Sequence, residues 1–454
     1  MNTLRDHDAV IAAWLDDGPQ TLPHDTRQAI VVGIRTVARR RAGVSWPFTR
    51  PGLPTIDLLP LSVALGSAAV IVVAATLAVN FYLHRAGIGG LPTTPGAWER
   101  VIIETPSGIG SVVSLAASPH GLLAVVGEDW RSDVARLVVS TDGQNWALVP
   151  AARHPKLSAP NGFGGPWGYP SVIGTDGGFL LLQLNELQLT EIWTSEDGYD
   201  WRRPAGAATG TDFGPRAVTA GGPGLVGVGG DNAWYSVDGS DWSEAVVPAL
   251  PEEILPRPAS ERYVEMTGVT AAGNDLIAWG MASVPFANNS EERVEVPLLW
   301  ASHDGRTWAS VVDPRMDSLA AVMDGPDGLV AVGETDGLAT VWLSADGQIW
   351  EKVDVRGLPP PISIGQGAAT KAGYVLVGGD RDCFGGSCRP STAAAIWTSP
   401  DGRSWSRLPS DERFARAGAT HVIAFGSRFV VGGGHDGGPT IWISDPDRSG
   451  SASQ

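Results

Sequence analysis

A short segment recurs along most of the chain and constrains the fold more than any other feature. Each complete copy reads Ser, any residue, Asp-Gly, two further residues and Trp, and a seventh copy beginning at Ser444 stops before its Gly and Trp. The six complete copies begin at Ser140, Ser195, Ser236, Ser302, Ser344 and Ser399. Successive copies are separated by 55, 41, 66, 42, 55 and 45 residues. This period is typical of a four-stranded unit repeated around an axis.

A second motif accompanies the first: a turn, containing Gly in most copies, followed by a run of apolar and β-branched residues. The seven runs occupy residues 121–127, 178–182, 224–229, 276–280, 328–333, 373–378 and 429–432. An uninterrupted apolar run of this length is typical of a strand buried on both faces, as when sheets stack around an axis. The two counts predict an all-β, seven-bladed propeller over residues 96–447.

The incomplete seventh copy predicts how the ring closes. It lacks the fourth strand that the Trp-containing segment supplies elsewhere, whereas residues 96–103 form a β-prone segment with no blade of their own. We expect this N-terminal strand to complete the last blade. Such closure pairs both ends of the array and leaves no exposed sheet edge at the junction.

The repeated segment resembles the Asp-box, or bacterial neuraminidase repeat, of sialidase-like propellers, with one residue fewer between Asp and Gly. The resemblance covers about 350 residues and implies that the box is a structural turn on the face away from the binding site. Turn chemistry supports this reading: Asp and Ser oxygens accept backbone N–H groups, and Gly supplies a positive φ. The box aspartates are Asp142, Asp197, Asp238, Asp304, Asp346 and Asp401. One carboxylate per turn is too few for Ca²⁺, so no metal site is expected.

If the boxes lie on one face, the long connections gather on the other. The longest predicted loops are 150–170, 247–264, 281–296 and 379–394. Aromatic residues beside carboxylates and Arg suit carbohydrate or peptide recognition, while ordinary polar surface is the alternative interpretation. The predicted ligand-binding residues are Trp130, Arg131, His154, Trp167, Tyr169, Glu261, Arg262, Tyr263, Arg381 and Asp382.

The chain has two cysteines, Cys383 and Cys388, which lie in the loop predicted over 379–394. Outside the cytoplasm this spacing favours a disulfide that closes a hairpin. A metal site is the alternative, but it needs two further ligands, and no His or other Cys lies nearby in the sequence.

The family resemblance implies a possible sialidase activity. Sialidases use a Tyr nucleophile paired with Glu, an Asp acid/base and three arginines that bind a carboxylate. Tyr263 with Glu261, and Arg131, Arg262 and Arg381, are the residues that could take these roles.

The sequence nevertheless favours a non-catalytic binding or scaffold module for a glycan or protein ligand. The Phe/Tyr-Arg-Ile-Pro signature of the family's catalytic domain is absent from residues 98–115, where Arg100 is the only arginine. Serine-nucleophile, zinc-hydrolase and phosphate-loop motifs are also absent, and no cofactor is expected. The net charge of -17 disfavours nucleic acid as a partner. A glycoside hydrolase remains the alternative.

An apolar segment predicts attachment to a membrane. Residues 58–79 contain no charge over 22 positions, which is long enough for a transmembrane helix within 58–83. Several arginines precede it, including Arg39 to Arg41, and only Arg85 follows closely. The positive-inside rule then places residues 1–57 in the cytoplasm and the propeller outside the cell.

The remaining segments complete the expected organisation. Residues 1–57 contain two short stretches of helical periodicity, so we expect a helical cytoplasmic segment with a possible cytoplasmic protein partner. In gross layout this resembles membrane anti-sigma factors, which implies a transmembrane sensor as a further alternative. Residues 84–95 are expected to be a flexible linker, and residues 448–454 a disordered tail.

Overall fold

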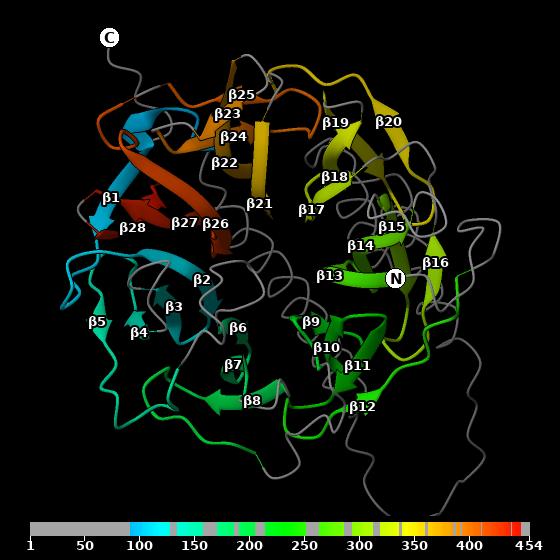
Figure 1. Ribbon diagram of the computed structural model, residues 1–454, viewed down its shortest axis with the longest axis horizontal. Helices are drawn as coiled ribbons and strands as arrows, with labels where there is room; N and C mark the ends of the chain where they lie inside the picture. The colour runs from blue at the N-terminus through cyan, green and yellow to red at the C-terminus, as the bar shows by residue number, and fades with distance from the viewer. Residues whose placement is uncertain are drawn as a thin grey trace, which may run out of the picture. The chain divides into compact units, whose positions relative to one another are not determined.

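The computed structural model describes residues 91–445, except for short gaps in the connections. The gaps are 128–133, 158–169, 186–189, 205–213, 251–262, 286–292, 312–317, 336–337, 359–361, 385–386, 391–392, 410 and 437. Seven antiparallel sheets are arranged around a common axis, with the first strand of each sheet innermost (Figure 1). The predicted seven-bladed propeller is therefore confirmed.

The blades are numbered here in chain order. Blade 1 comprises β2 (Ser111–Ser118), β3 (Gly121–Gly127), β4 (Ala135–Ser140) and β5 (Ala147–Leu148). Blade 2 comprises β6 (Ser171–Thr175), β7 (Gly178–Leu184) and β8 (Thr190–Ser195). Blade 3 comprises β9 (Ala217–Gly221), β10 (Gly224–Gly229), β11 (Asn232–Ser236) and β12 (Ser243–Glu244). Blade 4 comprises β13 (Tyr263–Ala272), β14 (Asp275–Pro285), β15 (Arg293–Ser302) and β16 (Ala309–Val311). Blade 5 comprises β17 (Ser318–Gly325), β18 (Gly328–Thr335), β19 (Leu338–Ser344) and β20 (Glu351–Val353). Blade 6 contains β21 (Ile362–Thr370), β22 (Gly373–Phe384), β23 (Ser387–Pro390), β24 (Ala395–Ser399) and β25 (Ser406–Arg407), and blade 7 contains β26 (Ala417–Phe425), β27 (Arg428–His435) and β28 (Gly438–Ser444).

The N-terminal strand closes the ring as predicted. After a short 3₁₀ turn over Pro95–Ala97, β1 (Trp98–Ile102) pairs antiparallel with β28, so that Trp98 lies opposite Ser444. The sheet order of blade 7 is therefore β1-β28-β27-β26. The indole N–H of Trp98 donates to the Pro92 carbonyl at 3.1 Å, and the side chain is only 2% exposed. The first described segment of the chain is thus anchored to the last blade.

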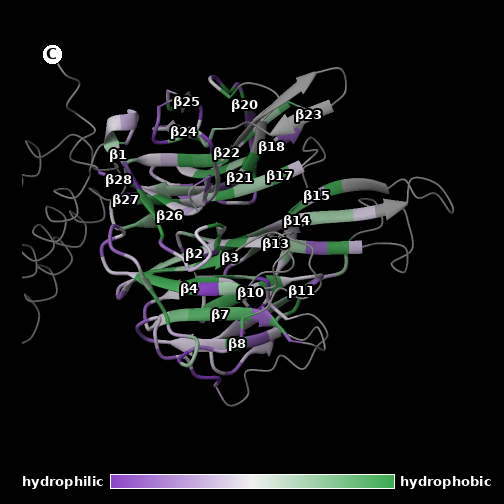
Figure 2. Cartoon of the chain, turned by 60° about the vertical axis from the view of Figure 1, so that its left-hand side comes forward, coloured by the Kyte–Doolittle hydropathy of each residue, from purple (hydrophilic) through white to green (hydrophobic). Residues whose placement is uncertain are grey.

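The hydrophobic core lies between adjacent blades, and Figure 2 shows apolar residues concentrated on the central strands. The second strands are buried along most of their length, as their continuous apolar sequence predicts. A Trp also stands two residues before the box Ser in six of the seven copies. Five of these indoles, at 234, 300, 342, 397 and 442, are at most 2% exposed. Burial of a side chain this large contributes about 3 kcal/mol or more to stability, so these residues hold the blades together.

Two segments predicted as loops are largely β-hairpins. Residues 281–285 continue β14 and 293–296 begin β15, with the pairing running from Leu276 opposite Ser302 to Pro285 opposite Arg293. In blade 6, β22 continues to Phe384 and pairs with β23. The prediction was wrong because it placed these residues outside the repeat. Apolar and polar residues alternate over 293–296, which is the periodicity of a strand.

The described part of the chain contains strands and one 3₁₀ turn but no α-helix. None of its segments is a helix long and apolar enough to cross a membrane. The predictions for residues 1–57, for the transmembrane helix at 58–83, for most of the linker and for the tail lie outside the described residues.

Candidate functional site

The boxes are turns that connect the third and fourth strands of a blade. In the first copy, the Ser140 hydroxyl accepts the Gly143 N–H at 2.8 Å. One carboxylate oxygen of Asp142 accepts the backbone N–H groups of Gln144 and Asn145, both at 2.8 Å. These bonds, with that to Asn145 the strongest, hold the pKa of Asp142 well below its usual range. The carboxylate is therefore occupied by the turn itself.

The same chemistry recurs around the ring. The pKa values of Asp304 and Asp346 are lowered by backbone bonds of this kind, and the box Gly residues have φ between 68° and 83°. The box Trp folds back on the turn: the indole of Trp146 donates to the Gly143 carbonyl at 2.9 Å. Among the described residues, no three His, Cys, Asp or Glu side chains are grouped to hold a metal ion.

Strand order separates the two faces of the propeller. Because strands alternate in direction, the boxes share one face with the turns between first and second strands. The opposite face, here called the loop face, carries the turns between second and third strands and the connections from one blade to the next. The extended hairpin of β14 and β15 projects from the loop face (Figure 2).

A channel runs along the propeller axis, with a volume of about 790 Å³. All seven innermost strands, from β2 to β26, contribute residues to its wall. Most of these residues are small or aliphatic. Larger polar and aromatic groups come from two sectors: Arg216, Thr267 and Trp279 in blades 3 and 4, and Gln366, Thr420 and His421 in blades 6 and 7.

A β-bulge places one extra residue in the channel wall of each of five blades. Within the described residues, the first-to-second-strand pairing skips one position in blades 1, 4, 5, 6 and 7. The skipped residues are Val113, Thr267, Ala320, Gly365 and Thr420, and all five line the channel. Bulges interrupt the regular ladder and redirect side chains, and they are common beside functional sites.

An ion pair joins blades 3 and 4 beside the channel. Arg216, just before β9, lies 2.6 Å from Glu265 of β13 through its Nη1 atom. The other carboxylate oxygen of Glu265 accepts the Tyr263 hydroxyl at 3.1 Å. Burial raises the pKa of Glu265, while Arg216 and Tyr263 oppose this effect. Burial, followed by the Glu265 charge, also raises the pKa of Tyr263.

Blades 6 and 7 supply an uncharged polar wall. The Gln366 side-chain oxygen accepts the Val422 N–H at 3.0 Å, which ties the two blades together. The Thr420 hydroxyl lies 2.9 Å from His421 Nδ1 and 3.3 Å from the carbonyl oxygen of Val112. Burial lowers the pKa of His421 to about 4, so its imidazole is neutral at neutral pH.

One aromatic ring reaches the channel from a second strand. Trp279 of β14 lies opposite Gly268 in the register, at a position held by Val or Gly in the other four bulged blades. A Cβ atom at Gly268 would lie 2.2 Å from the indole ring. Gly268 therefore provides the space through which Trp279 reaches the channel.

Few of the sequence-predicted binding residues belong to this site. Tyr263 is 50% exposed and bonded to Glu265, rather than to the predicted partner Glu261, which lies outside the described residues. His154 is not among the residues that line the channel; the carbonyl of neighbouring Arg153 accepts the N–H of Trp201, next to the box of blade 2.

The other predicted residues fall where the structure describes either nothing or the backbone alone. Residues Trp130, Arg131, Trp167, Tyr169 and Arg262 lie outside the described residues. The backbone positions of Arg381 and Asp382 are in β22, paired with Pro390 and Arg389 of β23. Cys383 and Cys388 lie directly opposite each other in the same hairpin, as a disulfide requires.

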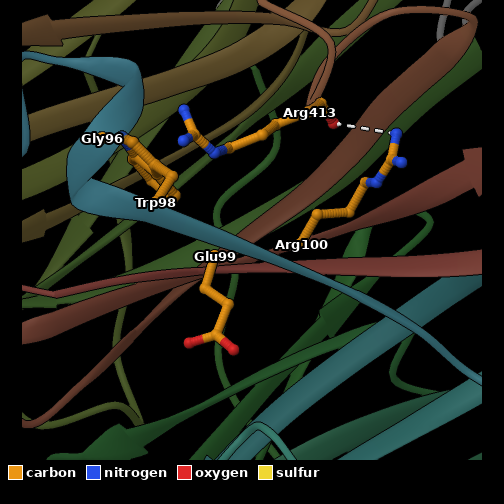
Figure 3. Close-up of a pocket in the computed structure, with 5 residues that line it drawn as sticks. All are labelled: Gly96, Trp98, Glu99, Arg100 and Arg413. Carbon is orange, nitrogen blue, oxygen red and sulfur yellow. Dashed lines mark hydrogen bonds between the residues drawn. The ribbon is translucent and has the colours of Figure 1, made fainter.

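A second cavity marks the closure of the ring (Figure 3). It has a volume of about 440 Å³ and is lined by Gly96, Trp98, Glu99, Arg100 and Arg413. The Arg100 guanidinium donates to the carbonyl of Glu412 at 3.0 Å, and Arg413 pairs with Asp411. Both arginines are bonded to other residues of the chain. We therefore assign this cavity to the packing of the closing strand and do not treat it as a ligand site.

Sequence reasoning missed Arg216, Glu265, Trp279, Gln366 and His421. They lie within or beside strands of the repeat, whose sequence first indicates core residues and not binding residues. Their signal was present as departures from the apolar pattern: Trp279 and Gly280 interrupt an aliphatic run, and His421 interrupts a first strand.

Comparison with known proteins bears on the fold alone. No family model and no curated protein matches the chain. YCF48 bound to a D1 peptide is similar at 14% identity and a TM-score of 0.49, covering 78% of this chain and 99% of that one. Virginiamycin B lyase from Staphylococcus aureus has 11% identity, a TM-score of 0.48 and coverages of 76% and 98%. The α-L-arabinanase of Penicillium chrysogenum complexed with arabinobiose has 14% identity, a TM-score of 0.41 and coverages of 77% and 98%.

Proposed function

We propose that the propeller is a non-catalytic binding module that takes a glycan or protein ligand into its central channel from the loop face. The observation that carries this proposal is the channel itself. Its volume of about 790 Å³ lies within the range of about 300 to 1,000 Å³ usual for ligand sites. Its wall is mostly apolar, with a few polar groups from separate blades, which is the usual composition of such sites.

The rigidity of the wall also supports a binding role. Gln366 ties blade 6 to blade 7, and Arg216 with Glu265 ties blade 3 to blade 4. Side chains fixed in this way lose little conformational entropy when a ligand arrives. The channel is therefore organised for recognition before a ligand binds.

The chemistry beside the channel favours binding over hydrolysis. Glycosidases generally need two carboxyl groups that flank the scissile bond. Among the described residues that line the channel there is no Asp or Glu, and the nearby Glu265 has both oxygens engaged. The pKa of Tyr263 is raised, which is opposite to the shift that would activate a tyrosine nucleophile.

A glycoside hydrolase is the second candidate, because Tyr263 and Glu265 form a hydrogen-bonded pair next to Arg216. Assays with fluorogenic glycosides, including a sialoside, distinguish the two functions. Turnover that disappears in Tyr263→Phe would establish the hydrolase. Saturable binding without turnover would support the binding module.

We further propose that the propeller is displayed outside the cell by a membrane anchor within residues 58–83. The support is the uncharged run over residues 58–79 and the arginines before it. A sensor role for residues 1–57 would require a cytoplasmic partner. Capture experiments with the full chain and with a variant lacking residues 1–57 test that role, and a partner retained by both would exclude it.

The binding function is tested with the full chain in detergent on an array of glycans and peptides. The channel variant is Trp279→Ala, and the control is Ile349→Ala, because the Ile349 side chain is 76% exposed within the box of blade 5, on the opposite face from the loops. We expect at least one glycan or peptide on the array to bind the unmodified chain and the control variant but not the channel variant. Binding that survives in both variants would place the site elsewhere.

A further inference from the structure

We propose that the ligand of the channel is a neutral saccharide, held against Trp279 and hydrogen-bonded by uncharged side chains on the opposite wall. This inference rests on the proposed function, because it assumes that the channel is the ligand site. It specifies the ligand by the charge, the aromatic surface and the hydrogen-bonding groups that the wall offers.

The first argument is charge. Arg216 is the one Lys or Arg among the described lining residues, and Glu265 neutralises it at 2.6 Å. His421, the other titratable lining residue, is neutral at neutral pH because its pKa is lowered to about 4. A charged ligand would lose its hydration in the channel without gaining an unpaired counter-charge. The net charge of -17 adds a further penalty for anions.

The second argument is the aromatic ring. Trp279 occupies a position held by Val or Gly in the other four bulged blades, and Gly268 leaves room for its ring. An indole offers a large apolar surface with a polar edge. The C–H faces of a sugar ring are apolar while its rim carries hydroxyls, so a saccharide fits a wall that combines Trp with polar groups.

The third argument is the kind of hydrogen bond available. The Gln366 oxygen is occupied by the Val422 N–H, which leaves the amide N–H₂ as the donor. Thr267 and Thr420 are exposed to the channel, and their hydroxyls lie 3.3 Å from the carbonyl oxygens of Trp279 and Val112. Donation to these carbonyls leaves the hydroxyl lone pairs of Thr267 as acceptors, and one on Thr420 besides its 2.9 Å contact with His421 Nδ1. Sugar hydroxyls can serve as both donors and acceptors to such groups.

The bulges argue against an extended peptide as the ligand. A peptide that adds to a strand edge needs a continuous row of backbone donors and acceptors. Five of the seven innermost strands are interrupted by a bulge in the middle of the channel wall. The regular edge is therefore broken where a peptide strand would need it.

The test compares neutral oligosaccharides with acidic ones of matched length on the full chain, using ligand-detected NMR followed by calorimetry. Two pairs have equal length and differ in charge: 3′-galactosyllactose with 3′-sialyllactose, and methyl-esterified with free oligogalacturonate of the same length. We expect at least one neutral saccharide to bind and its acidic counterpart to bind at least about tenfold more weakly.

Two variants assign the binding to the channel. Trp279→Ala should weaken the neutral saccharide by about tenfold or more, whereas Trp279→Phe should retain part of the affinity. Gln366→Glu keeps the acceptor for Val422 but removes the amide donor, so it provides an independent loss of binding if Trp279→Ala fails to fold. Ile349→Ala on the box side should bind like the unmodified chain.

The possible failures are distinguishable. Two outcomes would overturn the neutral saccharide but leave the binding function intact: preference for the acidic member of a pair, or binding of peptides alone. In both cases the binding would still be weakened by the two channel variants. Binding that ignores both variants, or no binding of any probe, would overturn both proposals.

Discussion

Arg216 and Glu265 form a 2.6 Å ion pair that connects blade 3 to the innermost strand of blade 4. The Glu265 side chain is 5% exposed and that of Arg216 is 26% exposed, so the pair is partly shielded from water. The same carboxylate accepts the Tyr263 hydroxyl. Glu265 therefore fixes two side chains beside the channel.

Glu265→Ala should destabilise the propeller because it removes the shielded carboxylate to which both Arg216 and Tyr263 are bonded. We expect a loss of about 1–3 kcal/mol in the free energy of unfolding, measured by urea denaturation. Glu351→Ala, in the outer strand β20 and exposed, is the control. Equal stability of the two variants would contradict a role for the ion pair in joining the blades.

The boxes should make the fold sensitive to acid. The pKa of Asp142 is lowered in the folded protein, mainly by the backbone N–H of Asn145. Such a group stabilises the fold above the usual Asp value of 3.8, and the contribution is lost as the pH falls toward the folded-state pKa. The same sign applies to Asp304 and Asp346.

We therefore expect Asp142→Asn to unfold with a shallower dependence on pH below about 4 than the unmodified chain. The measurement is the urea midpoint at a series of pH values. Asp176→Asn is the control, because none of the described hydrogen bonds involves the Asp176 carboxylate. Identical pH profiles for Asp142→Asn and the unmodified chain would contradict the prediction.

The Gly of the first box is required by its backbone conformation, and a side chain there would also displace the end of a neighbouring Ile side chain. Gly143 has φ of 81°, and a Cβ atom there would lie 2.4 Å from Cδ1 of Ile443 in blade 7. Gly143→Ala should lower the free energy of unfolding by about 1–3 kcal/mol. Gly418→Ala provides the matched control, since a Cβ there meets nothing within 4 Å. A smaller loss at 143 than at 418 would refute the structural account of the box.

The register of the β22–β23 hairpin suits a disulfide between its two cysteines. Cys383 and Cys388 face each other across β22 and β23, and directly opposed Cα atoms in an antiparallel pair lie about 4.5–5.5 Å apart. This separation falls within the range for a disulfide. Intact-mass measurement of the full chain under non-reducing conditions should show the loss of two hydrogens relative to the reduced chain. Two freely alkylated thiols under non-reducing conditions would exclude the bond.

The repeat made most of the fold predictable from the sequence, because its Ser, Asp and Gly act through local hydrogen bonds and backbone angles. Asp142 binds N–H groups two and three residues ahead, and such contacts can be read from spacing alone. The closing strand was predictable because the last repeat has no fourth strand of its own, whereas residues 96–103 are a β-prone segment that belongs to no other blade.

The channel site was not predictable in the same way. Arg216 meets Glu265 across 49 positions of sequence, and their contact depends on the packing of two blades. Trp279 reaches the channel because a bulge and Gly268 lie opposite it, and the bulge is visible only in the strand register. The sequence predicted binding residues in the long polar loops. Arg216, Glu265 and Trp279 lie instead within or just before strands whose sequence first indicates a structural role.

The closing strand provides the last prediction. Trp98 is 2% exposed and packs with the core between blades 6 and 7, whereas Ile102 in the same strand is 43% exposed. Trp98→Ala should lower the free energy of unfolding by about 3–5 kcal/mol, because it leaves a cavity where the two ends of the ring meet. Ile102→Ala should have a much smaller effect. Equal losses of stability in the two variants on thermal unfolding would show that β1 does not close the ring through its buried face. In that case removal of residues 96–104 would lower the stability no more than removal of the tail.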